Sequence, residues 1–252
     1  MATDELHEHF LTHGWAVVRG VVGAARLAEL EAQVDWLYAT WPPTRPGEVW
    51  EVPSVSRASP ETLGRHTHDP VIAEYVARVL GCDAVQLLQD TVLVKSPSDG
   101  AKVAWHQDHI YTGYLRPSQL ASVRLALTPC TVESGCLRVI DRSHLDEPLE
   151  VKALTESHVA DALGDAALAL ADRVVSIELA PGDISIHHCL TMHGSEENRS
   201  GGPRKTLITR IFDAACTLDR ARLPPGAEQY FPTDNDGHLD PAGFPVLWRR
   251  SP

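Results

Sequence analysis

The hydrophobic pattern of the chain changes from helical spacing to short apolar runs near residue 84. Leu27, Leu30, Val34 and Leu37 recur at the spacing of one helix face and predict a helix that packs through this face. A short helix is predicted over 4–12. The apolar run 15–18 before the next helix predicts a strand.

A further helix is predicted between Asp69 and Gly81. Asp is a preferred residue before the first helical turn, and Pro70 suits that turn because its φ angle is already fixed. Glycine commonly ends a helix in the left-handed conformation. These signals predict a helix that begins at residue 70 and stops before Gly81.

Beyond residue 84 the pattern predicts many short strands separated by turn residues. The expected strands are 85–95, 103–105, 122–128, 136–140, 174–179, 184–188 and 206–212. Such a series is typical of a β-sandwich or barrel. Residues 41–59 are expected to form a long loop, the alanine-rich stretch 155–170 a helical insertion, and the last thirty residues an irregular tail. We predict a mainly β single domain with a helical N-terminal part (1–84), a core (85–212) and a tail (213–252).

Composition narrows the function classes. The 252 residues, 43% hydrophobic and 22% charged, are those of an ordinary globular protein. A net charge of −12 argues against binding to nucleic acid or to anionic membranes, so an anionic substrate would need a local basic cluster. The chain has no apolar run of membrane-spanning length, and its acidic N-terminus does not resemble a signal peptide. The five cysteines lack CxxC spacing and are expected to be reduced thiols of a cytoplasmic protein.

Two distant polar motifs carry the candidate chemistry. His106 and Asp108 are two residues apart, so on a strand their side chains would share one face. With His193 they form a set of two histidines and one carboxylate, which binds Fe(II) on one face and leaves the other open. Arg204 adds a planar fork suited to a carboxylate, which favours an Fe(II) oxygenase that uses a 2-oxo acid. A His-x-Asp pair alone is a weak signal because such pairs occur by chance.

The motifs resemble, in order and spacing, those of the phytanoyl-CoA dioxygenase family of Fe(II)/2-oxoglutarate oxygenases. The matching segments are Trp105-His106-Gln107-Asp108, the run 133–140 with Ser143-His144, Pro181-Gly182-Asp183, His193-Gly194-Ser195, Asn198-Arg199-Ser200 and Pro203-Arg204. The resemblance spans residues 85–212. It implies a double-stranded β-helix core, the jelly roll of cupin-like proteins.

The resemblance also implies roles for individual residues. His106, Asp108 and His193 would bind Fe(II), and Arg204 and Ser195 would bind the far carboxylate of the 2-oxoglutarate cosubstrate. Thr91 is a candidate cosubstrate contact. Arg124, where relatives often carry an aromatic residue, is a candidate contact for a carboxylate or an anionic substrate. The reaction would consume O2, release succinate and CO2, and oxidise a C–H bond. Relatives that halogenate lack the carboxylate at the position of Asp108, so its presence favours hydroxylation.

Simpler interpretations stand beside these. Arg204 could be a surface arginine before a strand, and Ser195 could only stabilise a turn. His187 and His188, expected on the same strand as His193, could be core residues or support the ligands. Rival functions are a cupin-like metalloenzyme that does not use 2-oxoglutarate and a jelly-roll binding module.

The substrate is expected to be a small metabolite or natural-product intermediate of bacterial secondary metabolism. Desaturation, epoxidation and ring formation remain alternatives to hydroxylation, and the protein is expected to be a monomer or homodimer. Residues 41–59 and 155–170 are candidate lid and specificity elements, and Arg57 could reach the pocket from the first.

Overall fold

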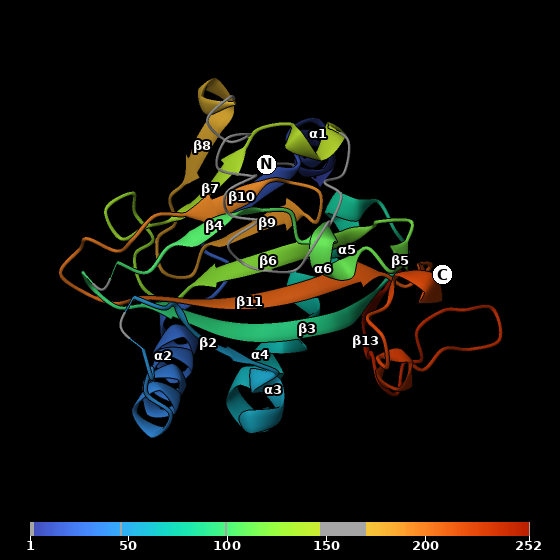
Figure 1. Ribbon diagram of the computed structural model, residues 1–252, viewed down its shortest axis with the longest axis horizontal. Coiled ribbons are helices and arrows are strands. Elements are labelled where there is room, and N and C mark those ends of the chain that lie inside the picture. Colours follow the sequence, from blue (N-terminus) through green and yellow to red (C-terminus); the bar gives the residue numbers. More distant parts are fainter. Residues whose placement is uncertain (1–2, 46, 99, 147–169, 252) are drawn as a thin grey trace.

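Two antiparallel sheets form the core of the protein, seen here in a computed structural model that describes residues 3–45, 47–98, 100–146 and 170–251 (Figure 1). The major sheet has the order β1 (Trp15–Val18), β9 (Ile184–His188), β6 (Leu120–Ala126), β11 (Arg204–Asp213), β3 (Ala84–Lys95) and β13 (Val246–Arg249), and β2 (Trp50–Pro53) also pairs with β3. The minor sheet has the order β4 (Val103–His106), β10 (His193–Ser195), β7 (Leu137–Ile140) and β8 (Val174–Ile177). A separate pair joins β5 (Leu115–Arg116) to β12 (Thr217–Leu218).

The chain crosses repeatedly between the two sheets, which confirms the predicted jelly roll. From β3 it passes to β4 in the minor sheet, returns to β6, and goes on to β7 and β8. It then returns to β9, crosses to β10 and comes back to β11. Residues far apart in sequence therefore face each other across the space between the sheets.

Helices cover the other side of the major sheet. The longer ones are α1 (Thr3–His13), α2 (Ala24–Thr40) and α5 (Pro70–Leu80), and the shorter ones are α3 (Val55–Ala58) and α4 (Arg65–Thr67). The short helix α6 (His109–Thr112) follows β4 instead. Single turns of other helix types lie at Pro60–Gly64, Ser143–Leu145, Ala171–Arg173, Arg220–Arg222 and Glu228–Tyr230. No helix among the described segments has the length and apolar character needed to cross a membrane.

The helix predicted from its end signals is confirmed in detail. The side chain of Asp69 accepts a hydrogen bond from the Val71 amide at 2.9 Å, and Gly81 has φ 69°. The apolar face of α2 is also confirmed, because Leu30, Val34 and Leu37 are buried. All five cysteines are unpaired and buried.

The major sheet has two faces of opposite character, which the strand register defines. Residues paired across an antiparallel sheet point to the same side. The inner face, toward the minor sheet, carries Arg204, Thr206, Ile208 and Arg210 of β11, Gln89, Thr91, Leu93 and Lys95 of β3, Ser122, Arg124 and Ala126 of β6, and Ser185 and His187 of β9. The helix-covered face carries the residues between them, such as Val92, Leu125, Ile186 and Leu207, which pack in one apolar cluster with α1, α2 and α5.

The region 41–59 is not the loop that its composition predicted. It contains β2, which pairs with β3, and the short helix α3. Asp90 on β3 holds α3 in place, since its carboxylate accepts hydrogen bonds from the Ser56 amide at 2.6 Å and the Ser56 hydroxyl at 3.0 Å. This long-range contact has no local sequence signal.

The tail is also more regular than predicted, because β13 adds an edge strand to the major sheet and pairs with the beginning of β3. The carbonyl of Pro245 accepts a hydrogen bond from the Leu87 amide at 2.9 Å. The predicted helix over 155–170 falls almost entirely outside the described residues.

Candidate metal centre

His106, Asp108 and His193 converge between the sheets, with one ligand atom from each lying within 4.8 Å of the others. His106 is the last residue of β4 and is paired with His193 on β10. Oδ1 of Asp108 lies 3.8 Å from Nε2 of His106 and 4.0 Å from Nε2 of His193. A single ion placed among these three atoms would be held on one side.

Asp108 does not lie on the same strand as His106. The prediction that strand alternation brings their side chains together was therefore wrong. β4 ends at His106, and Asp108 has helical backbone angles (φ −58°, ψ −25°) at the start of α6. Its carbonyl accepts hydrogen bonds from the amides of Tyr111 and Thr112. The turn into α6, rather than strand alternation, brings the carboxylate next to the histidine.

Backbone carbonyls orient both histidines toward the carboxylate. Nδ1 of His106 donates to the Ala104 carbonyl at 2.8 Å, and Nδ1 of His193 donates to the Thr191 carbonyl at 2.9 Å. A carbonyl can only accept, so Nδ1 carries the proton and Nε2 keeps its lone pair. Nε2 of His193 is buried and has no hydrogen-bond partner among the described residues.

Both carboxylate oxygens of Asp108 have close polar neighbours. Arg210 lies 3.3 Å from Oδ1. The hydroxyl of Ser122 donates to Oδ2 at 2.5 Å, and Nε2 of His187 lies 3.5 Å from the same oxygen. Burial alone raises the pKa of Asp108, but the Arg210 charge and the neighbouring imidazoles outweigh it and hold this pKa well below its usual value. The carboxylate is therefore ionised at neutral pH, as a metal ligand must be.

The donor set fits a divalent transition metal. Two imidazole nitrogens and one carboxylate are the facial arrangement used by non-haem Fe(II) oxygenases. Burial, followed by the charges of His106 and His187, lowers the pKa of His193 well below its usual value. This imidazole is therefore neutral and free to bind a cation. The unpartnered Nε2 atom is the direct sign that a ligand belongs here.

Two neighbours of Asp108 were not assigned from the sequence. Arg210 lies on β11 six residues after Arg204, so strand alternation alone places it on the same face. The sequence therefore contains a signal for the position of Arg210. His187 was expected on the same strand as His193, but β9 ends at His188 and β10 begins in the other sheet. The alternative that His187 supports a ligand agrees with its position beside Asp108.

Arg204 lies deep inside the fold rather than at the surface, with 1% of its area exposed. Nη1 donates to the Gly135 carbonyl at 2.5 Å, while Nε and Nη2 have no hydrogen-bond partner among the described residues. Gly135 has φ 68°, and a Cβ atom there would lie 2.3 Å from the Glu196 carbonyl oxygen. Only glycine fits this turn, and the turn supplies the one carbonyl that fixes Arg204.

Arg124 and Thr91 lie on the same inner face as Arg204. Both are paired with Ile208 in the register, one on each side of β11. Nε of Arg124 and the hydroxyl of Thr91 are buried and have no partner among the described residues. Burial, and then the charge of Arg204, lower the pKa of Arg124 to about 10. Two buried guanidinium groups that repel each other favour an anion between them.

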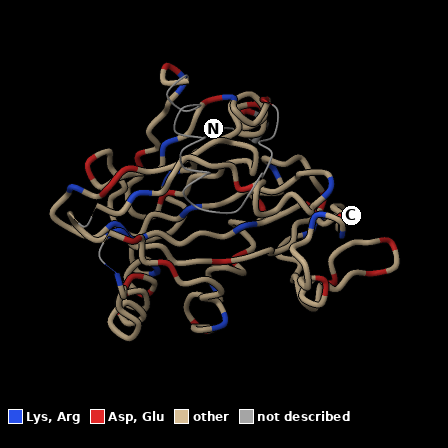
Figure 2. The backbone as a smooth tube through the Cα atoms, viewed as in Figure 1, with Lys and Arg blue, Asp and Glu red and all other residues tan. Residues whose placement is uncertain are grey.

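Ser195 lies on the opposite wall of this space. It is buried two residues after His193, with a register irregularity between them. Its carbonyl accepts a hydrogen bond from Nζ of Lys95 at 3.1 Å, and Lys95 is the register partner of Arg204. The structure thus places Ser195 near the Arg204 end of the inner face. Basic positions lie along the central strands as well as at the edges (Figure 2).

Comparison with known proteins establishes the family. The sequence profile of phytanoyl-CoA dioxygenase (PhyH) matches residues 10–206, which is most of the chain. The protein belongs to the phytanoyl-CoA dioxygenase family. The mouse phytanoyl-CoA dioxygenase domain-containing protein 1 is 26% identical over 165 residues, a match that covers 61% of this chain and 56% of the mouse protein. The chain therefore spans little more than half of that relative.

Solved structures of this family's fold cover nearly the whole chain. The non-heme alpha ketoglutarate dependent epimerase SnoN from nogalamycin biosynthesis superposes with a TM-score of 0.77 at 23% identity, over 100% of this chain and 99% of that one. The carbocyclase SnoK of the same biosynthesis gives 0.77 at 22% identity, over 96% and 95%. EctD from S. alaskensis gives 0.68 at 20% identity, over 85% and 78%. These similarities support the cupin-like jelly-roll fold.

Proposed function

We propose that the protein is an Fe(II)- and 2-oxoglutarate-dependent oxygenase. It oxidises a C–H bond of a small metabolite or natural-product intermediate, with hydroxylation as the expected outcome and succinate and CO2 as co-products. The observation that carries this proposal is the combination, inside one jelly roll, of a His-Asp-His set with two buried arginines. Both arginines have buried nitrogens that lack a partner among the described residues.

The inner face supplies a continuous path from the ligands to the arginines. Ser122 holds Asp108, and Arg124 is the next residue of β6 that points the same way. Arg204 completes the row on β11, about 20 Å of strand away from Arg210 at 3.3 Å per residue. A five-carbon dicarboxylate would bind along this face, with one end at the ligands and its far carboxylate at the planar guanidinium of Arg204.

Each residue then has a defined task. His106, Asp108 and His193 would hold the metal from one side. Arg204, with Arg124, Thr91 and Ser195 as neighbours, would bind the far carboxylate of 2-oxoglutarate. When bound, Fe(II) and 2-oxoglutarate supply the oxygen-activating chemistry, while the protein supplies position and exclusion of water.

Two proteins of this fold support the choice of cosubstrate. SnoN was crystallised with Fe3+, alpha ketoglutarate and nogalamycin RO, and EctD with 2-oxoglutarate and 5-hydroxyectoine. Because SnoN is an epimerase and SnoK a carbocyclase, the fate of the oxidised carbon needs its own measurement. The presence of Asp108 favours hydroxylation over halogenation.

The direct experiment measures succinate release and the substrate mass together. The purified protein with Fe(II), 2-oxoglutarate and O2 is screened against small metabolites, with the Asp108→Ala variant as the blank. A gain of 16 mass units indicates hydroxylation or epoxidation, no change indicates epimerisation, and a loss of 2 indicates desaturation or ring closure. A product formed without succinate would contradict the proposal and favour a cupin-like enzyme that does not use 2-oxoglutarate.

Arg204→Met tests the cosubstrate site. Losing a buried charge-assisted contact should raise the 2-oxoglutarate concentration for half-maximal succinate release by about 10- to 100-fold. The visible absorbance band of the anaerobic Fe(II)–2-oxoglutarate complex should require a similarly higher concentration. Arg199→Gln is the matched control because Arg199 is exposed. An unchanged requirement in Arg204→Met would remove this residue from its role.

A further inference from the structure

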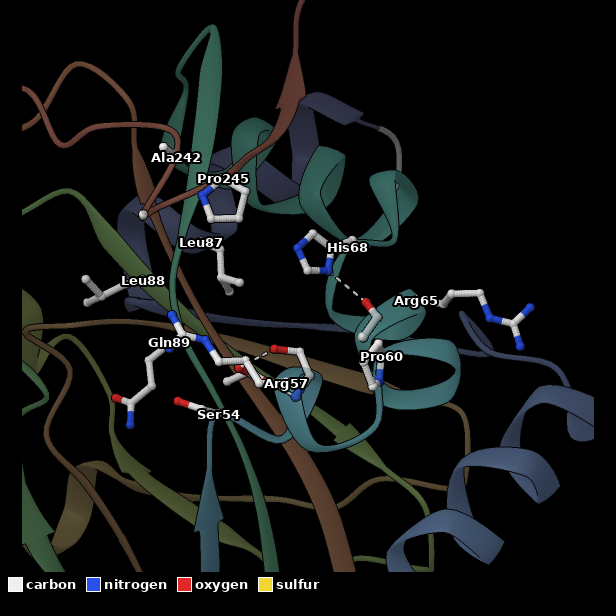
Figure 3. A pocket seen from close by; sticks show the side chains of 14 residues that line it. Ser54, Arg57, Pro60, Arg65, His68, Leu87, Leu88, Gln89, Ala242 and Pro245 are labelled. Atoms are coloured by element: carbon white, nitrogen blue, oxygen red, sulfur yellow. Dashed lines mark hydrogen bonds between the residues drawn. The ribbon is translucent and has the colours of Figure 1, made fainter.

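A cavity of about 570 Å³ lies between the turns after β2, the strand β3 and the C-terminal segment (Figure 3). This volume is within the range of sites that bind small organic molecules. None of the proposed metal-binding or cosubstrate-binding residues lines this cavity. Among the residues that line it are Arg57, His68, Leu87, Leu88, Gln89 and Pro245.

The walls of the cavity divide into an apolar and a polar part. Leu87 and Pro245 form one side and Pro60 lies across from them, while Leu88 points to the opposite side of β3 from Leu87 (Figure 3). Apolar walls of this kind bind a hydrocarbon portion of a ligand and exclude water from it.

The polar part is cationic and is not neutralised. The guanidinium of Arg57 extends from α3 toward Leu88 and Gln89 (Figure 3). No hydrogen bond or ion pair joins the Arg57 side chain to any residue in the described part of the chain. Nδ1 of His68 donates to the Gly64 carbonyl at 2.8 Å, which leaves the other ring nitrogen facing the cavity.

The other charged residues that line the cavity are either already hydrogen-bonded or point away from it. Asp90 is the single carboxylate among the lining residues, and its oxygens are bound by the Ser56 amide, the Ser56 hydroxyl and Thr67. Arg65 points away from the cavity, and its Nε donates to the Glu61 carbonyl. Arg57 is therefore the cation available to a ligand in the cavity.

The cavity is connected to the metal centre through two side chains. Gln89 lines the cavity, and its Oε1 accepts a hydrogen bond from Nη1 of Arg210 at 3.5 Å. Nη2 of Arg210 donates to Oδ1 of Asp108 at 3.3 Å. Exposure increases along this path, from the buried carboxylate of Asp108 to the exposed Gln89. A ligand that contacts Gln89 in the cavity would therefore be linked to Asp108 through Arg210 alone.

We propose that this cavity binds an amphiphilic organic anion, with its carboxylate or phosphate at Arg57 and its hydrocarbon part against Leu87 and Pro245. The proposal rests on the proposed function only where it takes this anion to be the substrate that the metal centre oxidises. His68 and Gln89 then hydrogen-bond the polar groups of the substrate, and Arg57 selects for negative charge.

Calorimetric titration of the metal-free full chain tests this site without turnover. The probes are octanoate, octyl phosphate and the neutral octyl glucoside, each below its micelle concentration. At least one anion should bind, and the neutral amphiphile should bind about tenfold more weakly or not at all. Preference between octanoate and octyl phosphate identifies which anionic group the site accepts.

Arg57→Gln and Arg65→Gln form a matched pair, because both arginines are exposed and line the same cavity while only Arg57 faces into it. Arg57→Gln should lower the affinity for the anion about tenfold, the effect of one partly exposed charge-assisted contact. Arg65→Gln should change it by less than about twofold. Equal binding of octyl glucoside, or equal affinities in the two variants, would overturn the proposal. The proposed function has a separate test, because only the absence of succinate release would contradict it.

Discussion

The two faces of the major sheet are made by alternate residues of the same strands, yet one face is apolar and the other is polar. On the helix-covered face, Val92, Leu125 and Leu207 pack against helices in an apolar cluster. On the inner face, Thr91 and Arg124, which adjoin Val92 and Leu125, and Arg204 of β11 are equally buried but polar. The first arrangement stabilises the fold through burial of apolar area. The second leaves polar atoms without partners among the residues that the structure describes, which costs stability.

The distribution of these unpartnered atoms identifies the functional face. Seven described residues carry a buried side-chain nitrogen or oxygen with no hydrogen-bond partner. Six of them lie between the sheets: Thr91, Arg124, Ser185, His187, His193 and Arg204. His144 is the seventh. Natural proteins rarely leave such groups unsatisfied, so their concentration on one face indicates ligands that bind there.

The largest stability difference is expected between Leu125→Ala and Arg124→Met, adjacent positions on β6. Leu125→Ala leaves a cavity in the apolar cluster and should lower the free energy of unfolding by about 2–5 kcal/mol. Arg124→Met removes a buried cation that is close to Arg204 and should lower it by less than about 1 kcal/mol, or raise it. Urea unfolding of the metal-free protein measures both.

Similar losses in the two variants would break the distinction between the faces. The order of the two effects should be reversed when 2-oxoglutarate binding is measured instead of stability. Arg124→Met should weaken 2-oxoglutarate binding, whereas Leu125→Ala should leave the affinity of the folded protein unchanged.

A smaller effect is expected from exchanging the neighbours Thr91 and Val92. Val92→Thr places a hydroxyl in the apolar cluster and should cost about 1–3 kcal/mol of unfolding free energy. Thr91→Val removes a hydroxyl that has no partner among the described residues, so the metal-free protein should change by less than about 1 kcal/mol or gain stability. Thermal unfolding of both variants provides the measurement. A marked loss in Thr91→Val would show that its hydroxyl already has a structural task.

The smallest effect concerns a titratable group within the helical layer. Burial, and then the charge of Arg26, lower the pKa of His66 to about 4. The unfolded chain, with a histidine pKa near 6.5, binds the extra proton between about pH 6.5 and 4. Stability should therefore fall as the pH drops through this window, by about 0.7 kcal/mol from pH 7 to 6.

His66→Gln should reduce this pH dependence in chemical unfolding of the metal-free protein. Part of the dependence should remain, because burial also lowers the pKa of His188, to about 3. An identical slope in His66→Gln and the unchanged protein would show that His66 takes up a proton without unfolding.

Local sequence signals predicted the elements well where they depend on nearby residues. The cap at Asp69, the glycine at 81 and the apolar face of α2 all act within a few residues, and each is confirmed. Elements that depend on distant partners were missed. β2, α3 and β13 exist because they pair with or are held by β3, and their own composition resembles that of loops.

The sequence by itself determined the candidate ligand residues and their order, because His106, Asp108, His193 and Arg204 can be recognised by residue type and spacing. Only the tertiary structure decided how they meet. Asp108 arrives from a helical turn, and Arg210 reaches it across 102 residues of chain because β11 lies between β3 and β6. Sheet order and register are set by long-range burial, so the inner row of arginines and the cavity at Arg57 became visible only in the folded chain.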